Sequence, residues 1–168
     1  MVERELRTEV CTGRRFSEIL INYCNWFASI PDSVFKTTYP HLPNLRIPSR
    51  ENHAVGEAFA ASLAGRSPCV LMQNSGLGLS LDALIGLFHL YQKGVLLVVS
   101  NRGELDWEEV QHQFWGEITE GLLNLLPVTV FDLEHLGESA IRKASEAAFI
   151  RNEIAVVVVH RGNLSESF

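Results

Sequence analysis

The stretch CVLMQNSGLGLSLDALIG, Cys69 to Gly86, joins an apolar run to a glycine-containing segment and then to an amphipathic run. With Pro68 in front, the apolar run predicts a short strand that is buried on both faces, because it does not alternate with polar residues. The segment NSGLG predicts a tight turn, and about fourteen residues of helix should follow it. A strand, a turn and a helix in this order are typical of a parallel α/β sheet.

The same alternation continues toward the end of the chain. Three further apolar runs, GVLLVVSN, PVTVFDLE and IAVVVVH, predict buried strands with helical segments between them. Before the opening stretch we expect a helix over 14–30, short strands around 33–36 and 45–48, and a small-residue helix that ends at Gly65. The chain is therefore predicted to be α/β. It should form a single three-layer domain over 14–168, with a central, mainly parallel sheet of about six strands flanked by helices, after a polar N-terminal segment over 1–13.

The composition narrows the class of protein. The 168 residues are 46% hydrophobic and 20% charged, which is typical of a globular domain. A net charge of −6 argues against nucleic acid as a partner, and no apolar run is long enough to predict a signal segment or a membrane span. The cysteines (Cys11, Cys24 and Cys69) are widely spaced, and the histidines lack metal-ligand spacing. We therefore expect a cytoplasmic protein with reduced thiols and no metal site of its own.

The glycine segment lacks the residues that dinucleotide and phosphate sites need. Leu81 stands where a dinucleotide fingerprint has its third glycine, and no Lys-Ser or Lys-Thr pair follows the glycines. A turn without a ligand and a turn that lets a ligand approach the backbone at Gly76 and Gly78 both remain open. Ligands of parallel sheets bind beyond the carboxyl ends of the strands. Four loops are therefore candidates for the site: 31–36, 49–52, 73–78 and 100–113.

Glu51 stands at the expected start of a helix, just after the extended segment LRIPS. By position alone it is a first-turn acid that the helix dipole favours, with Ser49 as the N-cap. However, RENHAVGEAFAASLAG followed by PCVLMQNSGLG resembles the pyrimidine-binding domain of thiamine diphosphate enzymes. Over 14–160 the sequence is similar to the phosphonopyruvate and sulfopyruvate decarboxylases. The similarity is carried by IPDSVFK (30–36), RENHAVGEA (50–58), LMQNSGLG (71–78), LLVVSNRGE (96–104) and VQHQFWGEIT (110–119).

The resemblance implies roles for several residues. A carboxylate against N1′ of the aminopyrimidine promotes the tautomer that activates the cofactor, and the match gives this role to Glu51. Ser33 and His112 are implied to face the substrate and to take part in catalysis, and Arg102 is implied to bind an anionic group of the substrate. Without the resemblance, these three would be interpreted as a turn residue, a solvated histidine and an exposed cation. The implied lining of the pyrimidine pocket is Gln73, Asn74, Ser75, Gly76 and Gly78.

The sequence lacks the motif that holds the other half of the cofactor. Enzymes of this class bind the diphosphate through a divalent cation in a domain marked by Gly-Asp-Gly, and this sequence contains no Gly-Asp-Gly. The resemblance therefore implies the α subunit of a split decarboxylase that converts 3-phosphonopyruvate, 3-sulfopyruvate or a similar acidic 2-oxo acid to an aldehyde and CO2. A β subunit would supply the diphosphate-binding domain and Mg²⁺, in an α2β2 assembly or a higher multiple.

One departure from the family pattern leaves the chemistry open. The family usually has Asn directly after GLG, whereas this sequence has Leu79. The reaction could therefore form a carbon–carbon bond instead of a simple aldehyde. A carboligase subunit and a non-catalytic scaffold or regulatory subunit remain alternatives to the decarboxylase subunit. An unrelated α/β ligand-binding module would require the five matches to be accidental.

Overall fold

The computed structural model describes residues 8–165; residues 1–7, part of the predicted polar segment, and residues 166–168 lie outside the described residues. Within 8–165, five strands form one parallel sheet in the order β2-β3-β4-β6-β5, and two short strands pair separately. The sheet consists of β2 (Trp26–Ser29), β3 (Pro68–Gln73), β4 (Val95–Asn101), β5 (Val128–Asp132) and β6 (Ile154–His160). The separate pair is β1 (Cys11–Thr12) with β7 (Leu164–Ser165).

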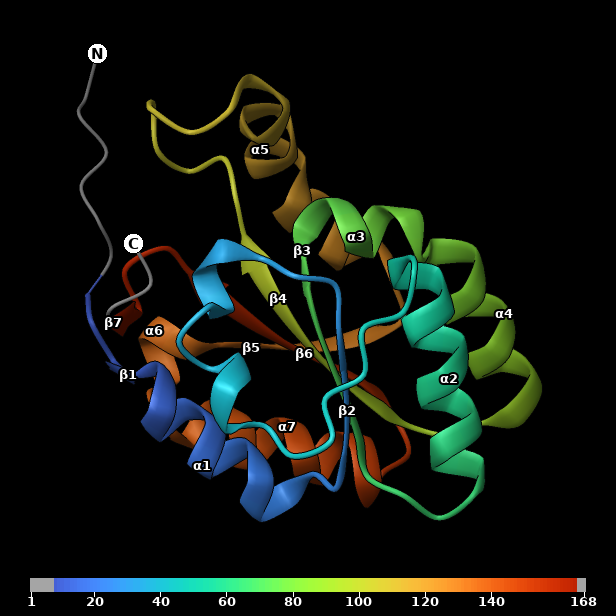
Figure 1. Cartoon of the computed structure of the whole chain (residues 1–168). Coiled ribbons are helices and arrows are strands. Elements are labelled where there is room, and N and C mark those ends of the chain that lie inside the picture. The colour runs from blue at the N-terminus through green and yellow to red at the C-terminus, as the bar shows by residue number, and fades with distance from the viewer. Residues whose placement is uncertain (1–7, 166–168) are drawn as a thin grey trace.

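Helices cover both faces of the sheet (Figure 1). One core cluster joins the sheet to the first and the last two helices, and a second cluster joins it to the four helices between them. This arrangement confirms the predicted three-layer α/β domain. The first face carries α1 (Gly13–Tyr23), α6 (Leu133–Leu136) and α7 (Ser139–Phe149). The second carries α2 (Glu51–Leu63), α3 (Asn74–Leu79), α4 (Leu81–Tyr91) and α5 (Val110–Leu125); η1 (Ser33–Phe35) and η2 (Tyr39–His41) are short 3-10 helices.

Strands β3, β4 and β6 lie inside the sheet and are largely apolar, because both of their faces are buried. In β3, Cys69 and Leu71 pack toward α1 and α7, whereas Val70 and Met72 pack toward α2 and α4. None of these four side chains is accessible to solvent. The apolar runs of β3, β4 and β6 therefore indicated doubly covered parallel strands correctly. The predicted burial of PVTVFDLE is wrong, because β5 lies at the edge of the sheet and none of its residues is buried.

The predicted helix over 14–30 is wrong in its second half. Helix α1 ends at Tyr23, and residues 26–29 form β2, which pairs with β3 at the edge of the sheet. The short strands predicted around 33–36 and 45–48 are also wrong: 33–35 is a 3-10 helix, and Arg46 makes only an isolated bridge to Ala28. The sheet therefore has five strands within the described residues rather than about six. Pairing with β3 buries Phe27 in the core, and this tertiary contact overrides the local helical spacing.

The segment NSGLG is a helix and not a turn. Residues 74–79 form α3 directly after β3, and Ser80 separates α3 from α4. Glycine inside a helix costs about 1 kcal/mol relative to alanine. Two glycines in one six-residue helix therefore need an explanation from packing.

Three further features concern redox state, membranes and metals. The cysteines at 11, 24 and 69 are all buried and free. No helix in the described part of the chain has the length and hydropathy that crossing a bilayer would require. Among residues 8–165, no three His, Cys, Asp or Glu side chains are grouped in a way that could hold a metal ion.

Candidate active site

The carboxyl ends of the parallel strands lie at one edge of the sheet, below α3 and the first turns of α5 (Figure 1). The segments that contain the predicted site residues follow these strand ends or begin beside them. We call this edge the carboxyl edge. It is where ligands of parallel α/β sheets bind.

Glu51 is the first residue of α2 and is half-buried. Arg50 before it is extended, and no side chain caps this helix start. Within residues 8–165, the Glu51 carboxylate forms neither an ion pair nor a hydrogen bond, although it is shielded in part from water. A half-buried carboxylate without a partner is available to a ligand that can share a proton with it.

The two glycines of α3 permit close packing around Glu51 and α5. A Cβ atom on Gly76 would lie 2.5 Å from Cγ of Glu51, and a Cβ atom on Gly78 would overlap the ring of Trp115. Any side chain at position 76 would therefore displace Glu51. This close approach accounts for glycine in a helix where alanine has the better propensity.

Asn74 ties the end of β3 to the segment that follows β4. Its side-chain amide donates to the carbonyl oxygen of Arg102 at 2.9 Å, to Oγ1 of Thr119 at 2.9 Å and to Oδ1 of Asn101 at 3.1 Å. Asn74 is buried, so its amide serves this framework. The neighbouring Gln73 and Ser75 are half-buried, and their side chains form no hydrogen bond with the described residues. Among the predicted pocket residues, these two keep polar groups available for a ligand.

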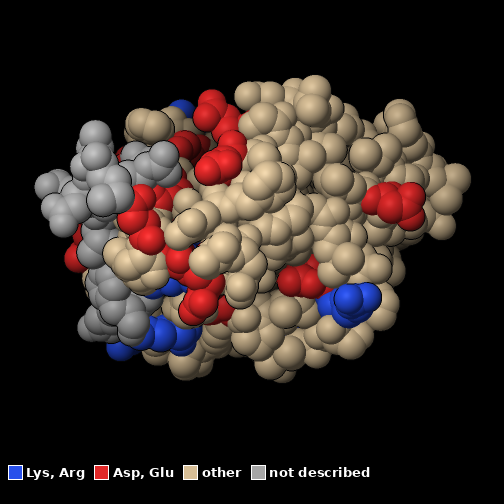
Figure 2. All heavy atoms as spheres, turned by 90° about the horizontal axis from the view of Figure 1, so that it is seen from above, with Lys and Arg blue, Asp and Glu red and all other residues tan. Residues whose placement is uncertain are grey.

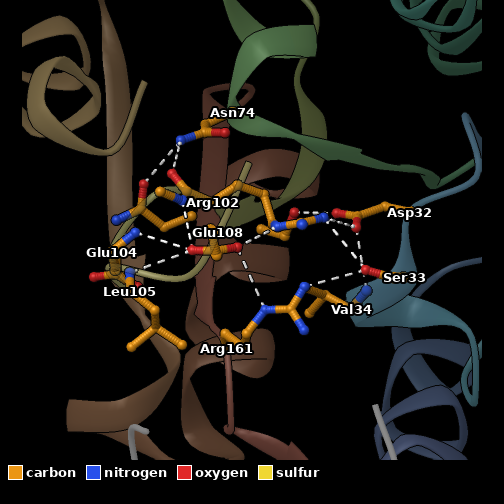
Figure 3. A network of polar contacts seen from close by, with 12 residues as sticks. Asp32, Ser33, Val34, Asn74, Arg102, Glu104, Leu105, Glu108 and Arg161 are labelled. Carbon is orange, nitrogen blue, oxygen red and sulfur yellow. Dashed lines mark hydrogen bonds and ion pairs between the residues drawn. The ribbon is translucent and has the colours of Figure 1, made fainter. Parts of the chain in front are cut away.

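Ser33 and Arg102 meet in a buried charge network, formed by Asp32, Arg102, Glu108 and Arg161 (Figure 3). The guanidinium of Arg102 donates to Oε1 of Glu108 at 2.7 Å and to Oδ1 of Asp32 at 2.9 Å. The Asp32 side chain is 1% exposed and that of Glu108 is fully buried. Arg102 is therefore a buried cation between two carboxylates, and not an exposed cation free to bind an anion.

Glu108 holds the segment after β4 in place. Its Oε2 accepts the backbone N–H of Gly103 at 2.7 Å and that of Glu104 at 3.1 Å. Burial by itself would raise the pKa of Glu108, but the hydrogen bonds from Arg102 and the backbone outweigh it and lower the pKa. The carboxylate therefore stays ionised and keeps the loop anchored to the network.

His112 lies in the first turn of α5 and is half-buried. Its Nδ1 is shielded from solvent and has no hydrogen-bond partner among the described residues. Burial and the nearby positive charge of Arg102 both lower the pKa of His112. The ring is therefore mainly neutral at neutral pH and keeps one nitrogen available.

A cavity of about 440 Å³ opens beside α5 at the same edge. Viewed from above, acidic side chains gather on one part of this face, and the remainder is largely uncharged (Figure 2). Sequence reasoning missed this cavity, although Asp132 lies near the end of one predicted strand and His160 ends another, so the strand-end rule could have found them. The titratable side chains that line the cavity are Glu104, Glu120, Asp132, Glu134, His135 and His160.

His160 joins two of these carboxylates. Its Nδ1 lies 2.8 Å from Oε2 of Glu104, and its Nε2 lies 2.9 Å from Oδ2 of Asp132. Burial would lower the pKa of His160, but the hydrogen bonds and charges of the two carboxylates outweigh it and raise the pKa. His160, at the end of β6, therefore ties the end of β5 to the segment that follows β4.

The structure brings the predicted residues to one edge, but in two groups. Glu51 contacts α3 at Gly76, and Gly78 contacts α5 at Trp115. Ser33 and Arg102 belong to the charge network, three of whose members, Asp32, Glu108 and Arg161, sequence reasoning missed. Arg161 directly follows the last long strand, and that position is the signal that could have drawn attention to it.

Comparison with known sequences identifies close relatives, although no protein-family model matches the chain. The sulfopyruvate decarboxylase subunit alpha of Methanococcus maripaludis is 32% identical over 152 residues, which cover 86% of this chain and 90% of that protein. The phosphonopyruvate decarboxylase of Streptomyces viridochromogenes is 35% identical over 78 residues, which cover 46% of this chain and 20% of that protein.

Solved structures share the fold at low sequence identity. The 2-oxoglutarate:ferredoxin oxidoreductase of Magnetococcus marinus matches 89% of this chain with a TM-score of 0.69 and 16% identity. The thiamine diphosphate-dependent 4-hydroxybenzoylformate decarboxylase of Rhodococcus jostii matches 97% with a TM-score of 0.56 and 14% identity. This chain covers only 28% and 36% of those two chains. The identity of 32% across 90% of the Methanococcus maripaludis subunit shows that this chain belongs to the family of sulfopyruvate decarboxylase alpha subunits.

Proposed function

We propose that this chain is the pyrimidine-binding α subunit of a thiamine diphosphate-dependent decarboxylase. Its substrate would be an acidic 2-oxo acid of the 3-sulfopyruvate or 3-phosphonopyruvate type, and its products an aldehyde and CO2. The named activities of the two relatives support the substrate class. The observation that carries the proposal is the half-buried Glu51 carboxylate, which has no partner within residues 8–165.

The residues around Glu51 fit an aminopyrimidine. The carboxylate is shielded and unpaired, and α3 approaches it closely at Gly76, where a Cβ atom would displace it. When bound, thiamine diphosphate supplies the nucleophilic carbon and the electron sink that decarboxylation of a 2-oxo acid requires. Glu51 then holds a proton at N1′ of the pyrimidine, and the ring is lined by Gln73, Asn74, Ser75, Gly76 and Gly78.

The second group of residues faces the substrate. Ser33 is exposed at the carboxyl edge and offers a hydroxyl group. Arg102 acts through Ser33, because its own charge is already paired with Asp32 and Glu108. His112 is mainly neutral at neutral pH because burial and Arg102 lower its pKa, so its ring can accept and pass on a proton.

The diphosphate half of the cofactor is assigned to a partner subunit. The chain spans about a third of the two solved chains that it matches, and the relative in Methanococcus maripaludis is called a subunit alpha. A β subunit would hold the diphosphate through Mg²⁺, with the cofactor between the subunits in an α2β2 assembly.

Calorimetric titration with thiamine diphosphate and Mg²⁺ tests this assignment. The chain is co-expressed with its presumed β subunit, and each subunit alone serves as a control. We expect tight binding only by the pair. Decarboxylation of 3-sulfopyruvate and 3-phosphonopyruvate by the pair is then followed as CO2 release.

Glu51→Gln tests the catalytic role within the same pair. General acid–base groups contribute about 10²- to 10⁴-fold in rate, and we expect a loss of that size while the pair still assembles. Glu57→Gln, in the same helix, is the matched control and should retain activity. A Glu51→Gln pair with unchanged turnover, or a pair that binds no cofactor, would instead identify a non-catalytic scaffold. A carbon–carbon bonded product would identify a carboligase and draw attention to Leu79.

A further inference from the structure

The hydroxyl oxygen of Ser33 lies between two arginines (Figure 3). Nη1 of Arg102 donates to Oγ of Ser33 at 3.3 Å, and Nη2 of Arg161 donates to the same oxygen at 3.3 Å. The arginines come from the ends of two different strands, β4 and β6, while Ser33 follows β2. The Ser33 hydroxyl therefore accepts hydrogen bonds from two other segments of the carboxyl edge.

These contacts determine the direction of the Ser33 proton. A serine hydroxyl has one O–H donor and two acceptor lone pairs. Both lone pairs face guanidinium N–H groups, and no described residue accepts the Ser33 proton. Since Ser33 is exposed, its O–H is directed away from the network and toward the open edge. Ser33 is thereby a hydrogen-bond donor for a ligand and not an acceptor.

Arg161 is nearly buried and makes few polar contacts besides the one with Ser33. Its side chain is 8% exposed, and its Nε lies 3.4 Å from Oε1 of Glu108. Arg102 takes the shorter contact with that same oxygen, at 2.7 Å. The guanidinium of Arg161 also stacks on Trp107, 5.0 Å from the ring centroid. Packing thus fixes the guanidinium while its Nη2 reaches Ser33.

The net charge of the network determines whether it can attract an anionic ligand. Arg102 and Arg161 carry two positive charges, and Asp32 and Glu108 carry two negative charges. The network is therefore neutral overall, and it cannot attract an anion by net charge alone. Its selectivity for an oxyanion has to come from the direction of the Ser33 O–H.

We propose that Arg161 is a positioning residue that, with Arg102, fixes Ser33 as a donor to an oxyanion of the substrate. The proposal rests on the function proposed above. The oxyanion is either the carboxylate that every 2-oxo acid carries or the sulfonate or phosphonate at the far end of the substrate. Both groups have negatively charged oxygen atoms that can accept a hydrogen bond from the Ser33 hydroxyl.

The test uses the co-expressed pair with Ser33→Ala, Arg161→Met and the double variant. A hydrogen bond to a charged group is worth roughly a tenfold to hundredfold effect on binding. We expect Ser33→Ala to raise KM for 3-sulfopyruvate about tenfold or more, with thiamine diphosphate affinity unchanged. Arg161→Met should raise KM in the wild-type background and have no further effect in the Ser33→Ala background, because it acts through that hydroxyl. Ser33→Thr keeps the hydroxyl and should restore the KM.

Pyruvate distinguishes the two oxyanions, because it has the carboxylate and lacks the sulfonate. An equal loss with both substrates would assign Ser33 to the carboxylate, and a loss with 3-sulfopyruvate only would assign it to the sulfonate. Calorimetric binding of 3-sulfopropanoate, which carries both anionic groups and cannot react, measures the contribution of Ser33 to binding without turnover. Arg161→Lys provides a second variant if Arg161→Met does not fold.

Three outcomes would overturn the proposal. The first is an unchanged KM and unchanged 3-sulfopropanoate affinity in Ser33→Ala. The second is an Arg161→Met effect of equal size in both backgrounds, which would show a structural role separate from Ser33. In both cases the wild-type pair still binds cofactor and turns over, so the proposed function stands. A wild-type pair that binds no thiamine diphosphate would refute the proposed function together with this inference.

Discussion

The carboxyl edge contains two regions that differ in whether their charged side chains are paired. In the charge network, each of the four charged side chains is buried and lies against an opposite charge. At the start of α2, the half-buried Glu51 carboxylate has no partner within residues 8–165. Removing charges from water is costly unless they are paired. The network therefore serves to hold the loops, whereas the unpaired carboxylate of Glu51 is the group that we propose binds the cofactor.

The comparison separates side chains that stabilise the structure from side chains that we propose bind the cofactor. Changes in the network should affect the stability of the chain first, and changes around Glu51 should affect ligand binding and turnover first. The Glu51→Gln experiment examines the second class, and Ser33→Ala examines substrate binding beside the charge network. Three further variants test how far this division holds, and they are taken from the largest expected effect on stability to the smallest.

Glu108→Ala should cause the largest loss of stability. It leaves Arg102 with only one carboxylate and removes the acceptor of the backbone N–H groups of Gly103 and Glu104. Removing one member of a buried ion pair costs about 3–5 kcal/mol, and urea denaturation measures the loss. Glu109→Ala, at an exposed neighbouring position, should change the free energy of unfolding by less than about 0.5 kcal/mol. Equal effects of the two variants would contradict the framework role of the network.

Gly76→Ala should cause an intermediate loss of stability. It tests both stability and ligand binding, because the added methyl group would displace Glu51. The added methyl group would lie 2.5 Å from Cγ of Glu51, and overpacking of this kind costs about 1–3 kcal/mol. We also expect weaker binding of thiamine diphosphate by the pair, because Glu51 has to move. Gly121→Ala is the control, since its added methyl group meets no atom within 4 Å. There alanine should stabilise α5 by about 0.5–1 kcal/mol. A Gly76→Ala variant as stable as Gly121→Ala would rule out close packing at Glu51.

The smallest change in the free energy of unfolding is expected when a change in pH titrates His160. The pKa of His160 is raised above its ordinary value of 6.5, so the stability it contributes is fully present below 6.5 and is lost as pH rises through the higher folded value. The hydrogen bonds and charges that lower the pKa of Asp132 outweigh its burial, so its contribution is lost only as pH falls below 3.8. Urea denaturation between pH 5 and about 9 should therefore show a decline in stability that His160→Asn removes. His41→Asn, at an exposed position, should retain the decline; a His160→Asn variant that retains it as well would refute the assignment.

Strands β3 to β6 could be predicted from their apolar runs, which burial on both faces explains for β3, β4 and β6 but not for the edge strand β5. The fifth strand, Trp26–Ser29, could not. Its residues continue the spacing of α1, and only the pairing with β3 distinguishes strand from helix there. The glycine helix α3 was missed for a similar reason, since its glycines reflect contacts with Glu51 and Trp115 that are distant in the chain.

The site divides in the same way. Glu51 and the residues proposed to line the pyrimidine pocket lie in contiguous motifs, so the resemblance of those motifs to a known family was enough to propose them. The charge network consists of single residues far apart: Asp32 and Arg102 are 70 positions apart, and Ser33 and Arg161 are 128 apart. No local pattern links such pairs, because each contact depends on the order in which the strands assemble.

The sequence by itself therefore determined the α/β class, the four strands between residues 68 and 160, and the place of Glu51 at the start of a helix. These properties follow from the periodicity of burial and from short motifs, which are local. Only the tertiary structure decided that Arg102 is paired, that Arg161 reaches Ser33 and that Gly76 makes room for Glu51. Those facts depend on which strand ends lie side by side, and the parallel crossovers of the chain establish that order only when the sheet is complete.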